Sequence, residues 1–161
     1  MSNEKPCFIV DAMLGKLAKK LRLLGFDSLY FSDIEDEEII KKAKNENRIL
    51  ITKDGSLSQK SIKQQIETIQ ITKEDEIEQF LQINEKVSLG KCIVSGNTSR
   101  CPVCNGKLEN TEKKDVFEKI PSGVYEKMND FWICEKCKKI YWEGTHIKNL
   151  QKFTAKLNER L

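Results

Sequence analysis

The sequence lacks the patterns that mark membrane-spanning and secreted proteins. No stretch approaches the roughly 20 apolar residues that a helix needs to cross a bilayer. Residues 1–6 are polar and lead directly into a short apolar run, which is not a signal-peptide pattern. No internal repeat or low-complexity segment stands out either. We therefore expect a soluble, cytoplasmic protein with no membrane partner.

Histidine is nearly absent, with His146 alone, but the chain has six cysteines, and four of them form two equally spaced pairs. The pairs are Cys101-Pro102-Val103-Cys104 and Cys134-Glu135-Lys136-Cys137. Each Cys-x-x-Cys can place two thiolates on one side of a tight turn, so two pairs can supply four zinc ligands. Without a secretion signal, zinc is favoured over disulfides, and a redox role for one pair is the minor alternative. Four thiolates leave no position for water, so the predicted zinc is structural.

Charge is divided unevenly along the 161 residues, although the net charge is only +3. Residues 1–90 carry 14 Lys/Arg and 16 Asp/Glu, whereas residues 91–161 carry 14 and 9. The length suits one compact domain of about 100 residues and a small metal-stabilised module. We expect the first domain at 1–90 and a zinc-ribbon module with a C-terminal helix at 91–161. The basic module could guide a polyanion, and a solvated surface explains the charge equally well.

The first half of the chain alternates between strand-like and helix-like patterns. Strands are predicted at 7–10, 28–31, 48–52 and 66–71, and helices at 13–25, from Asp36 to Asn47, near Leu57 and at 74–83. Such alternation implies right-handed crossovers and a mainly parallel sheet with helices on both faces. The stretch 147–161 has apolar residues at helical spacing and is predicted to pack back as a helix.

Three aspartates follow the predicted strands or open the helix behind one. Asp11 and Asp54 come directly after strand-like runs, and Asp36 enters the second predicted helix. Loops at the carboxyl ends of parallel strands share one edge, so these carboxylates can be neighbours in space. Carboxylates in one crevice repel each other unless a cation joins them, and oxygen ligands suit Mg²⁺ or Mn²⁺. Such a metal can activate water and neutralise charge on a phosphodiester.

Local roles explain the same residues without a metal. Asp11 and Asp36 can cap the helices that follow them, and Asp54 can open a turn through Gly55. Thr52 could orient Asp54 or a metal-bound water through its hydroxyl, or only end the strand. The pattern alone leaves these interpretations open.

Several motifs, in one order, resemble a known family. The segments are Phe8-Ile9-Val10-Asp11-Ala12-Met13-Leu14-Gly15-Lys16-Leu17-Ala18, Leu21-Arg22-Leu23-Leu24-Gly25-Phe26-Asp27, Arg48-Ile49-Leu50-Ile51-Thr52-Lys53-Asp54, Cys101-Pro102-Val103-Cys104-Asn105-Gly106-Lys107-Leu108 and Tyr141-Trp142-Glu143-Gly144-Thr145-His146. Together with the second cysteine pair, they are similar to the Mut-seven C-terminal RNase domain family over residues 7–147.

The resemblance implies a PIN-like three-layer α/β/α domain with a mainly parallel sheet, followed by a small zinc ribbon. It also implies a ribonuclease in which Asp11, Asp36 and Asp54 bind Mg²⁺ or Mn²⁺, and a metal-activated water hydrolyses RNA. Many PIN domains have a fourth acid after the fourth strand, and Asp75 is the nearest candidate here. The alternative is a non-catalytic RNA-binding or ribosome-associated adaptor with the same fold.

Basic and aromatic side chains in the matched segments are candidates for RNA contact. They are Lys16, Arg22, Lys53, Trp142 and His146. Basic side chains supply most non-specific affinity for nucleic acids, and aromatic rings can stack on bases. Lys19 and Lys20 are attributed instead to the solvated face of their helix, and a structural hydrogen bond is the alternative for His146.

Overall fold

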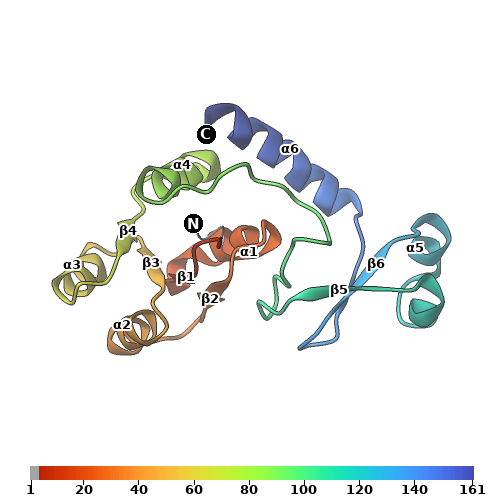
Figure 1. The fold of residues 1–161 in the computed structure, drawn as a ribbon, viewed down its shortest axis with the longest axis horizontal. Coiled ribbons are helices and arrows are strands. Elements are labelled where there is room, and N and C mark those ends of the chain that lie inside the picture. The colour runs from red at the N-terminus through yellow and green to blue at the C-terminus, as the bar shows by residue number, and fades with distance from the viewer. Residues whose placement is uncertain (1–3) are drawn as a thin grey trace.

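The computed structural model describes residues 4–161, which form two sheets with flanking helices (Figure 1). The strands are β1 (Phe8–Val10), β2 (Ser28–Tyr30), β3 (Ile49–Thr52), β4 (Thr68–Gln70), β5 (Leu108–Thr111), β6 (Phe131–Cys134) and β7 (Ile140–Tyr141). The helices are α1 (Gly15–Leu23), α2 (Asp36–Asn45), α3 (Gly55–Lys63), α4 (Glu76–Lys86), α5 (Ser122–Lys127) and α6 (Thr145–Arg160), with 3-10 turns η1 (Ala12–Leu14) and η2 (Lys113–Val116).

The first sheet is parallel throughout, with strand order β2-β1-β3-β4. Its side chains alternate between two apolar clusters: Phe8 and Val10 pack with α1, α4 and α6, whereas Ile9 packs with α2 and α3. Helices therefore cover both faces of the sheet, and the predicted three-layer α/β arrangement is confirmed. The second sheet is antiparallel, with order β5-β6-β7, and carries the cysteine pairs at one end.

The predicted helix stops at Gly25 and Asn47 are confirmed, because both residues adopt left-handed backbone conformations. Gly25 has φ +92°, and the N–H of Phe26 donates to the carbonyl of Leu21, which closes the end of α1. Asn47 has φ 53° and ends α2 in the same way. A third such turn at Gln65, with φ 63°, ends α3. The chain is still in this turn at Ile66, so β4 is shorter than predicted.

Helix α6 returns to the parallel sheet and packs beside α4, as predicted from its apolar spacing (Figure 1). Leu150 and Leu157 are buried in the same cluster as Phe8 of β1. Asn158 also holds the linker that leads to the ribbon: its side chain accepts from the N–H of Cys92 and donates to the carbonyl of Cys92, both over 2.8 Å. The chain therefore leaves the first core at residues 89–94 and re-enters it through α6.

None of the helices in residues 4–161 combines the length and the apolar character that crossing a membrane requires.

Candidate functional site

The connections after β1 and β3 leave the parallel sheet in opposite directions. β1 leads to β2 on one side, and β3 leads to β4 on the other. Open α/β sheets bind ligands in the crevice at the carboxyl ends of two such strands. The strands pair with Val10 opposite Ile51, so Asp11 and Asp54 follow the carboxyl ends of β1 and β3, and we call this edge of the sheet the crevice.

Thr52 joins the two aspartates through one hydroxyl group. Its Oγ1 donates to Oδ2 of Asp11 over 2.8 Å and accepts from the backbone N–H of Asp54 over 2.9 Å. Thr52 is completely buried, whereas Asp11 is half-buried and Asp54 exposed. A fixed hydroxyl beneath two accessible carboxylates therefore sets the geometry of the crevice.

Each aspartate also caps the helix or turn that follows it, as the sequence allowed. Oδ1 of Asp11 accepts from the N–H of Ala12 over 2.8 Å. Oδ1 of Asp54 accepts from the N–H groups of Ser56 and Leu57, over 2.8 and 3.4 Å. Oδ2 of Asp54 accepts no hydrogen bond from residues 4–161. Capping and metal binding are compatible here, because the cap uses only one of the two oxygens.

The structure does not bring the third predicted aspartate into the same cluster. Asp36 begins α2 and forms an ion pair with Lys60 of α3 over 3.6 Å. Asp75, the candidate for a fourth acid, caps α4 by accepting from the N–H of Glu78. Within residues 4–161, the cysteines are the only group of three or more side chains close enough to share one ion.

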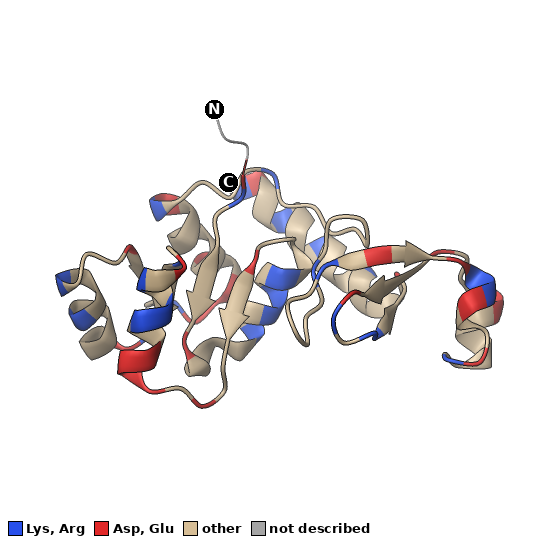
Figure 2. Ribbon diagram, turned by 60° about the horizontal axis from the view of Figure 1, so that its bottom comes forward, with Lys and Arg blue, Asp and Glu red and all other residues tan. Residues whose placement is uncertain are grey.

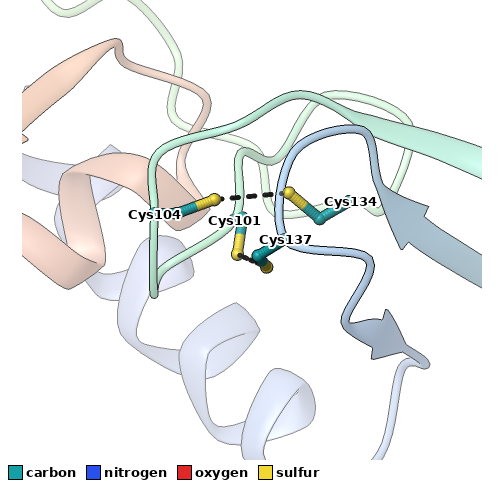
Figure 3. Close-up of side chains that lie close together, drawn as sticks. All are labelled: Cys101, Cys104, Cys134 and Cys137. Atoms are coloured by element: carbon teal, nitrogen blue, oxygen red, sulfur yellow. Dashed lines mark hydrogen bonds between the residues drawn. The ribbon is translucent and has the colours of Figure 1, made fainter.

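The four cysteines of the two pairs converge at one end of the ribbon (Figure 3). Their sulfur atoms lie within 4.8 Å of one another, with 3.7 Å between Cys101 and Cys137 and 3.4 Å between Cys104 and Cys134. A tetrahedral site with Zn–S bonds of about 2.3 Å has sulfur–sulfur separations of about 3.8 Å. The predicted ligand set therefore has the spacing that zinc requires.

Both cysteine turns have the same backbone design. The N–H of Asn105 donates to the carbonyl of Cys101, and the N–H of Lys138 donates to the carbonyl of Cys134. Asn105 and Lys138 both have left-handed φ, of 69° and 65°. Gly106 leaves room for the sulfurs, since a Cβ at this position would lie only 2.7 Å from Sγ of Cys134. The turns are thus shaped around a compact sulfur cluster, which is what a bound metal needs.

The thiols of the cluster influence one another's ionisation. Burial raises the pKa of Cys134, but hydrogen bonds from the backbone N–H groups of Cys137 and Lys136 outweigh it and bring the pKa to about 7. A backbone hydrogen bond from Lys139 lowers the pKa of Cys137, but partial desolvation of this exposed thiol and its contacts with the neighbouring thiols outweigh it and raise the pKa to about 12. Four thiolates this close repel one another unless a cation compensates their charge.

A hydroxyl group completes the surroundings of the cysteines. The hydroxyl of Tyr141 lies 2.9 Å from Sγ of Cys101. Burial, together with its contact with Cys101, raises the pKa of Tyr141. Tyr141 therefore keeps its proton at neutral pH and can donate a hydrogen bond to a thiolate, as side chains around metal ligands commonly do.

The two remaining cysteines lie outside the cluster. Cys92 is buried and Cys7 is half-buried.

Arg22 is predicted as an RNA contact, but the structure places it at the joint between the parallel sheet and the ribbon. Its side chain is buried, with 5% exposed. The guanidinium donates to the carbonyls of Ser28, Pro102 and Val103, over 2.8, 2.9 and 3.4 Å. Because these carbonyls occupy the guanidinium, we assign Arg22 to holding the first cysteine turn against α1 and do not propose it as an RNA contact.

Asp27 forms the second half of this joint. Its Oδ1 accepts from the guanidinium of Arg48 over 2.9 Å and from Nδ2 of Asn105 over 2.7 Å. Asn105 also accepts, through Oδ1, from the backbone N–H of Ser28 over 3.0 Å. Burial raises the pKa of Asp27, but the hydrogen bonds and the charges of Arg48 and Arg100 outweigh it and hold the pKa below its usual value.

Three of the predicted RNA contacts lie together in one groove. Lys16 on α1, Trp142 after β7 and His146 at the start of α6 all line a cavity of about 760 Å³. Lys53 is elsewhere and pairs with Glu74 over 3.1 Å. The groove also contains Lys19 and Lys20, which the sequence analysis attributed to solvent.

Three residues of the joint, Asp27, Arg48 and Asn105, are not among the predicted site residues. Asn105 had a usable signal, because asparagine is one of the few residues that commonly adopt a positive φ. It follows the second cysteine of a Cys-x-x-Cys pair, where the turn needs that conformation. For Asp27 and Arg48, nothing local indicates that their partners come from the other sheet or from distant loops.

Comparison with known proteins gives one match. The family model described as Mut7-C RNAse domain matches residues 6–154, which include both the crevice and the cysteine cluster. No curated protein and no solved structure matches the chain.

Proposed function

The chain belongs to the Mut7-C RNAse domain family, and on that premise we propose that it hydrolyses RNA phosphodiester bonds with the help of Mg²⁺ or Mn²⁺. The observation that carries the proposal is the pair Asp11 and Asp54 at the crevice between β1 and β3, connected by the hydroxyl of Thr52. Carboxylate and hydroxyl oxygens are the donors that these cations prefer.

The residues around the crevice have separate tasks in this proposal. Asp11 and Asp54 hold the cation, and Oδ2 of Asp54 has free capacity for it. Thr52 fixes the direction of the Asp11 carboxylate from beneath. When bound, the cation would supply an activated water and neutralise charge on the phosphodiester.

Asp36 has a conditional place in the site. To bind the cation, its carboxylate would exchange the ion pair with Lys60 for the metal. Mg²⁺ is commonly bound by one or two carboxylates together with substrate phosphates rather than by an all-protein cage. We therefore propose that RNA phosphate completes a site founded on Asp11 and Asp54, with Asp36 as the outer carboxylate.

The cysteine cluster has a structural task in the proposal. We place one Zn²⁺ at Cys101, Cys104, Cys134 and Cys137, in a ribbon module that aids RNA binding. Within the module's expected range of 91–161, the C-terminal helix α6 packs on the first core. Four thiolates fill a tetrahedron and leave no position for a reacting water. Reduced thiols suit a cytoplasmic location.

The direct test is cleavage of labelled RNA by the full chain, with Mn²⁺ or Mg²⁺ present or removed. We expect cleavage with the ion, and a loss of at least about a hundredfold in Asp54→Asn, since asparagine keeps the helix cap but not the charge. Asp130→Asn, at an exposed position directly before β6, is the matched control. Zinc content is measured in parallel, so that loss of the crevice ion is distinguished from loss of zinc. Cleavage that survives Asp54→Asn or complete ion removal contradicts the proposal.

A second candidate is an RNA-binding or ribosome-associated adaptor without catalysis. The ion pair between Asp36 and Lys60 favours it, because the third predicted carboxylate is then neutralised by a lysine of the chain itself. This candidate predicts RNA binding that weakens steeply with salt, no turnover, and no dependence on Asp54. Ion-dependent turnover eliminates it.

A further inference from the structure

The groove beside α1 is lined by both basic and apolar side chains. It lies between α1 and the segment that joins β7 to α6, and its volume is about 760 Å³. The basic side chains are Lys16, Lys19, Lys20 and Lys139. The apolar side chains include Leu23, Ile140, Trp142, Ile147 and Leu150. In Figure 2 the basic bands of α1 lie between the parallel sheet and the ribbon. A ligand that consists of phosphate alone would need the basic side chains but not the apolar ones.

Two of the lysines are available to a ligand. Lys20 is occupied by Glu76, at 2.5 Å, and by the ring of Phe153, and Lys139 lies over the ring of Tyr141. Lys16 and Lys19 are exposed, and neither has an ion-pair partner among residues 4–161. Their spacing on α1 puts them on the same helix face. The groove therefore presents two unpaired positive charges side by side.

The two tryptophans of the chain have different surroundings. Trp132 is buried, and its indole donates to Oδ1 of Asn97 over 3.1 Å. Trp142 is only partly buried, lines the groove, and makes no hydrogen bond within residues 4–161. Gly144 leaves space for this indole, since a Cβ there would lie 3.2 Å from its Nε1. The indole of Trp142 is therefore not fixed by a hydrogen bond, and its ring face is available to a ligand.

The groove leads toward the crevice between β1 and β3. Lys16 stands in the first turn of α1, and the short turn η1 connects that helix directly to Asp11. At its other end, α1 meets the first cysteine turn, where Pro102 and Val103 line the groove. A chain lying along α1 would thus run from the ribbon to the carboxylates.

We propose that this groove binds unpaired nucleotides, so that the substrate is RNA with a single-stranded segment. Lys16 and Lys19 contact phosphates, and Trp142 stacks on a base. The volume is that of a pocket for a small molecule, within the usual range of roughly 300–1,000 Å³, and accepts a nucleotide or two rather than a helix. Only an unpaired base has a free face for stacking. The statement about substrate rests on the proposed nuclease function, whereas the binding itself does not.

The charge side of the proposal is tested by salt-dependent binding. Fluorescein-labelled single-stranded RNA and a blunt RNA duplex are titrated into the full chain carrying Asp54→Asn, which prevents cleavage from interfering. Each lost phosphate contact lowers the magnitude of the negative slope of log affinity against log salt by about 0.7 for single strands. We expect Lys16→Gln with Lys19→Gln to lower it by about 1.4. Lys41→Gln with Lys63→Gln, on helices of the opposite sheet face, removes the same charge and should leave the slope unchanged.

The stacking side is tested by two substitutions of Trp142. Trp142→Ala should weaken single-strand binding about tenfold or more, while Trp142→Phe, which keeps an aromatic face, should keep most of the affinity. Binding should also quench the fluorescence of Trp142 in a Trp132→Phe background. Zinc content and thermal unfolding of each variant show whether it is folded.

Several outcomes overturn the proposal. They are equal affinity for duplex and single strand, single-strand affinity that is unaffected by both sets of groove substitutions, and no RNA binding at all, which would leave the groove to a protein partner. Binding at the groove without cleavage at any ion concentration leaves this inference standing and removes the nuclease proposal, so the two failures are distinguishable.

Discussion

The side-chain amide of Asn105 donates to the carboxylate of Asp27 over 2.7 Å. One residue follows the second cysteine of the first cysteine turn, and the other immediately precedes β2 of the parallel sheet. The contact means that the position of the ribbon and the edge of the nuclease core are determined together.

Replacing Asp27 with asparagine should lower stability in a pH-dependent manner. Because the pKa of Asp27 is lowered in the folded state, the ionised group stabilises the fold above its unfolded pKa of about 3.9. That stabilisation is lost as the pH falls through the lower, folded-state pKa. We expect Asp27→Asn to cost about 1.5–3 kcal/mol at pH 7, and the difference from the parent to shrink below about pH 4.

Urea unfolding between pH 7 and pH 3 measures this effect. Asp33→Asn, at an exposed position before α2, is the control and should follow the parent at every pH. A constant difference between Asp27→Asn and the parent across this range would show that the carboxylate charge is not responsible.

Removing the guanidinium of Arg22 should loosen the ribbon. Arg22→Met leaves the carbonyls of Ser28, Pro102 and Val103 without their donor, and we expect a loss of about 2–3 kcal/mol. Lys41 is exposed on α2, so Lys41→Met removes a charge of the same sign without breaking such contacts. The measurement is the free energy of unfolding in urea, and equal stability of the two variants contradicts the assigned role.

Thr52→Val should damage the crevice more than the fold. It leaves Oδ2 of Asp11 and the N–H of Asp54 without their shared hydroxyl, at a cost of about 1–3 kcal/mol. If the proposed nuclease function is correct, cleavage at saturating Mn²⁺ should fall about tenfold or more, which is the usual effect of losing a group that orients a metal ligand. Thr154→Val, whose buried hydroxyl bonds only to Gln151 within α6, should leave cleavage unchanged.

Zinc binding should depend on the absence of a side chain at Gly106. The parent should bind one zinc per chain, release protons on binding, and bind more tightly as the pH rises, because thiolates are the ligands. Gly106→Ala places a Cβ 2.7 Å from Sγ of Cys134 and should weaken zinc binding about tenfold or more. Gly123→Ala has open space around its Cβ and serves as the control in a competition titration with a chromophoric chelator. Unchanged affinity in Gly106→Ala would mean that the turn relaxes freely.

Local patterns were sufficient to predict most of the parallel domain. The apolar spacing of α1 and the stop at Gly25 depend on neighbouring residues alone, and both appear as expected. Asp11 and Asp54 could be predicted to approach each other because both follow strands that pair in the sheet. The cysteine cluster could be predicted equally well, since the spacing within each pair already defines the turn.

The remaining features depend on how distant elements pack. Asp36 meets Lys60 because α2 and α3 lie side by side on one face of the sheet, which no local pattern specifies. Arg22 resembles any basic residue on a helix, and only the arrival of the first cysteine turn buries it. The groove likewise combines Lys16 with Trp142, which are far apart in the sequence.

The return of α6 to the first core has a consequence for biosynthesis. The segment that leaves this core and the helix that re-enters it lie on either side of the ribbon in the sequence. The ribbon is therefore inserted within the sequence of the first core. Chains emerge from the ribosome N-terminus first, and Leu157, which is made after both cysteine turns, packs in the same cluster as Phe8 of the first strand. The nuclease core cannot be completed until the cysteine turns have been synthesised. Synthesis of the ribbon therefore precedes maturation of the crevice, a site to which no ribbon residue contributes.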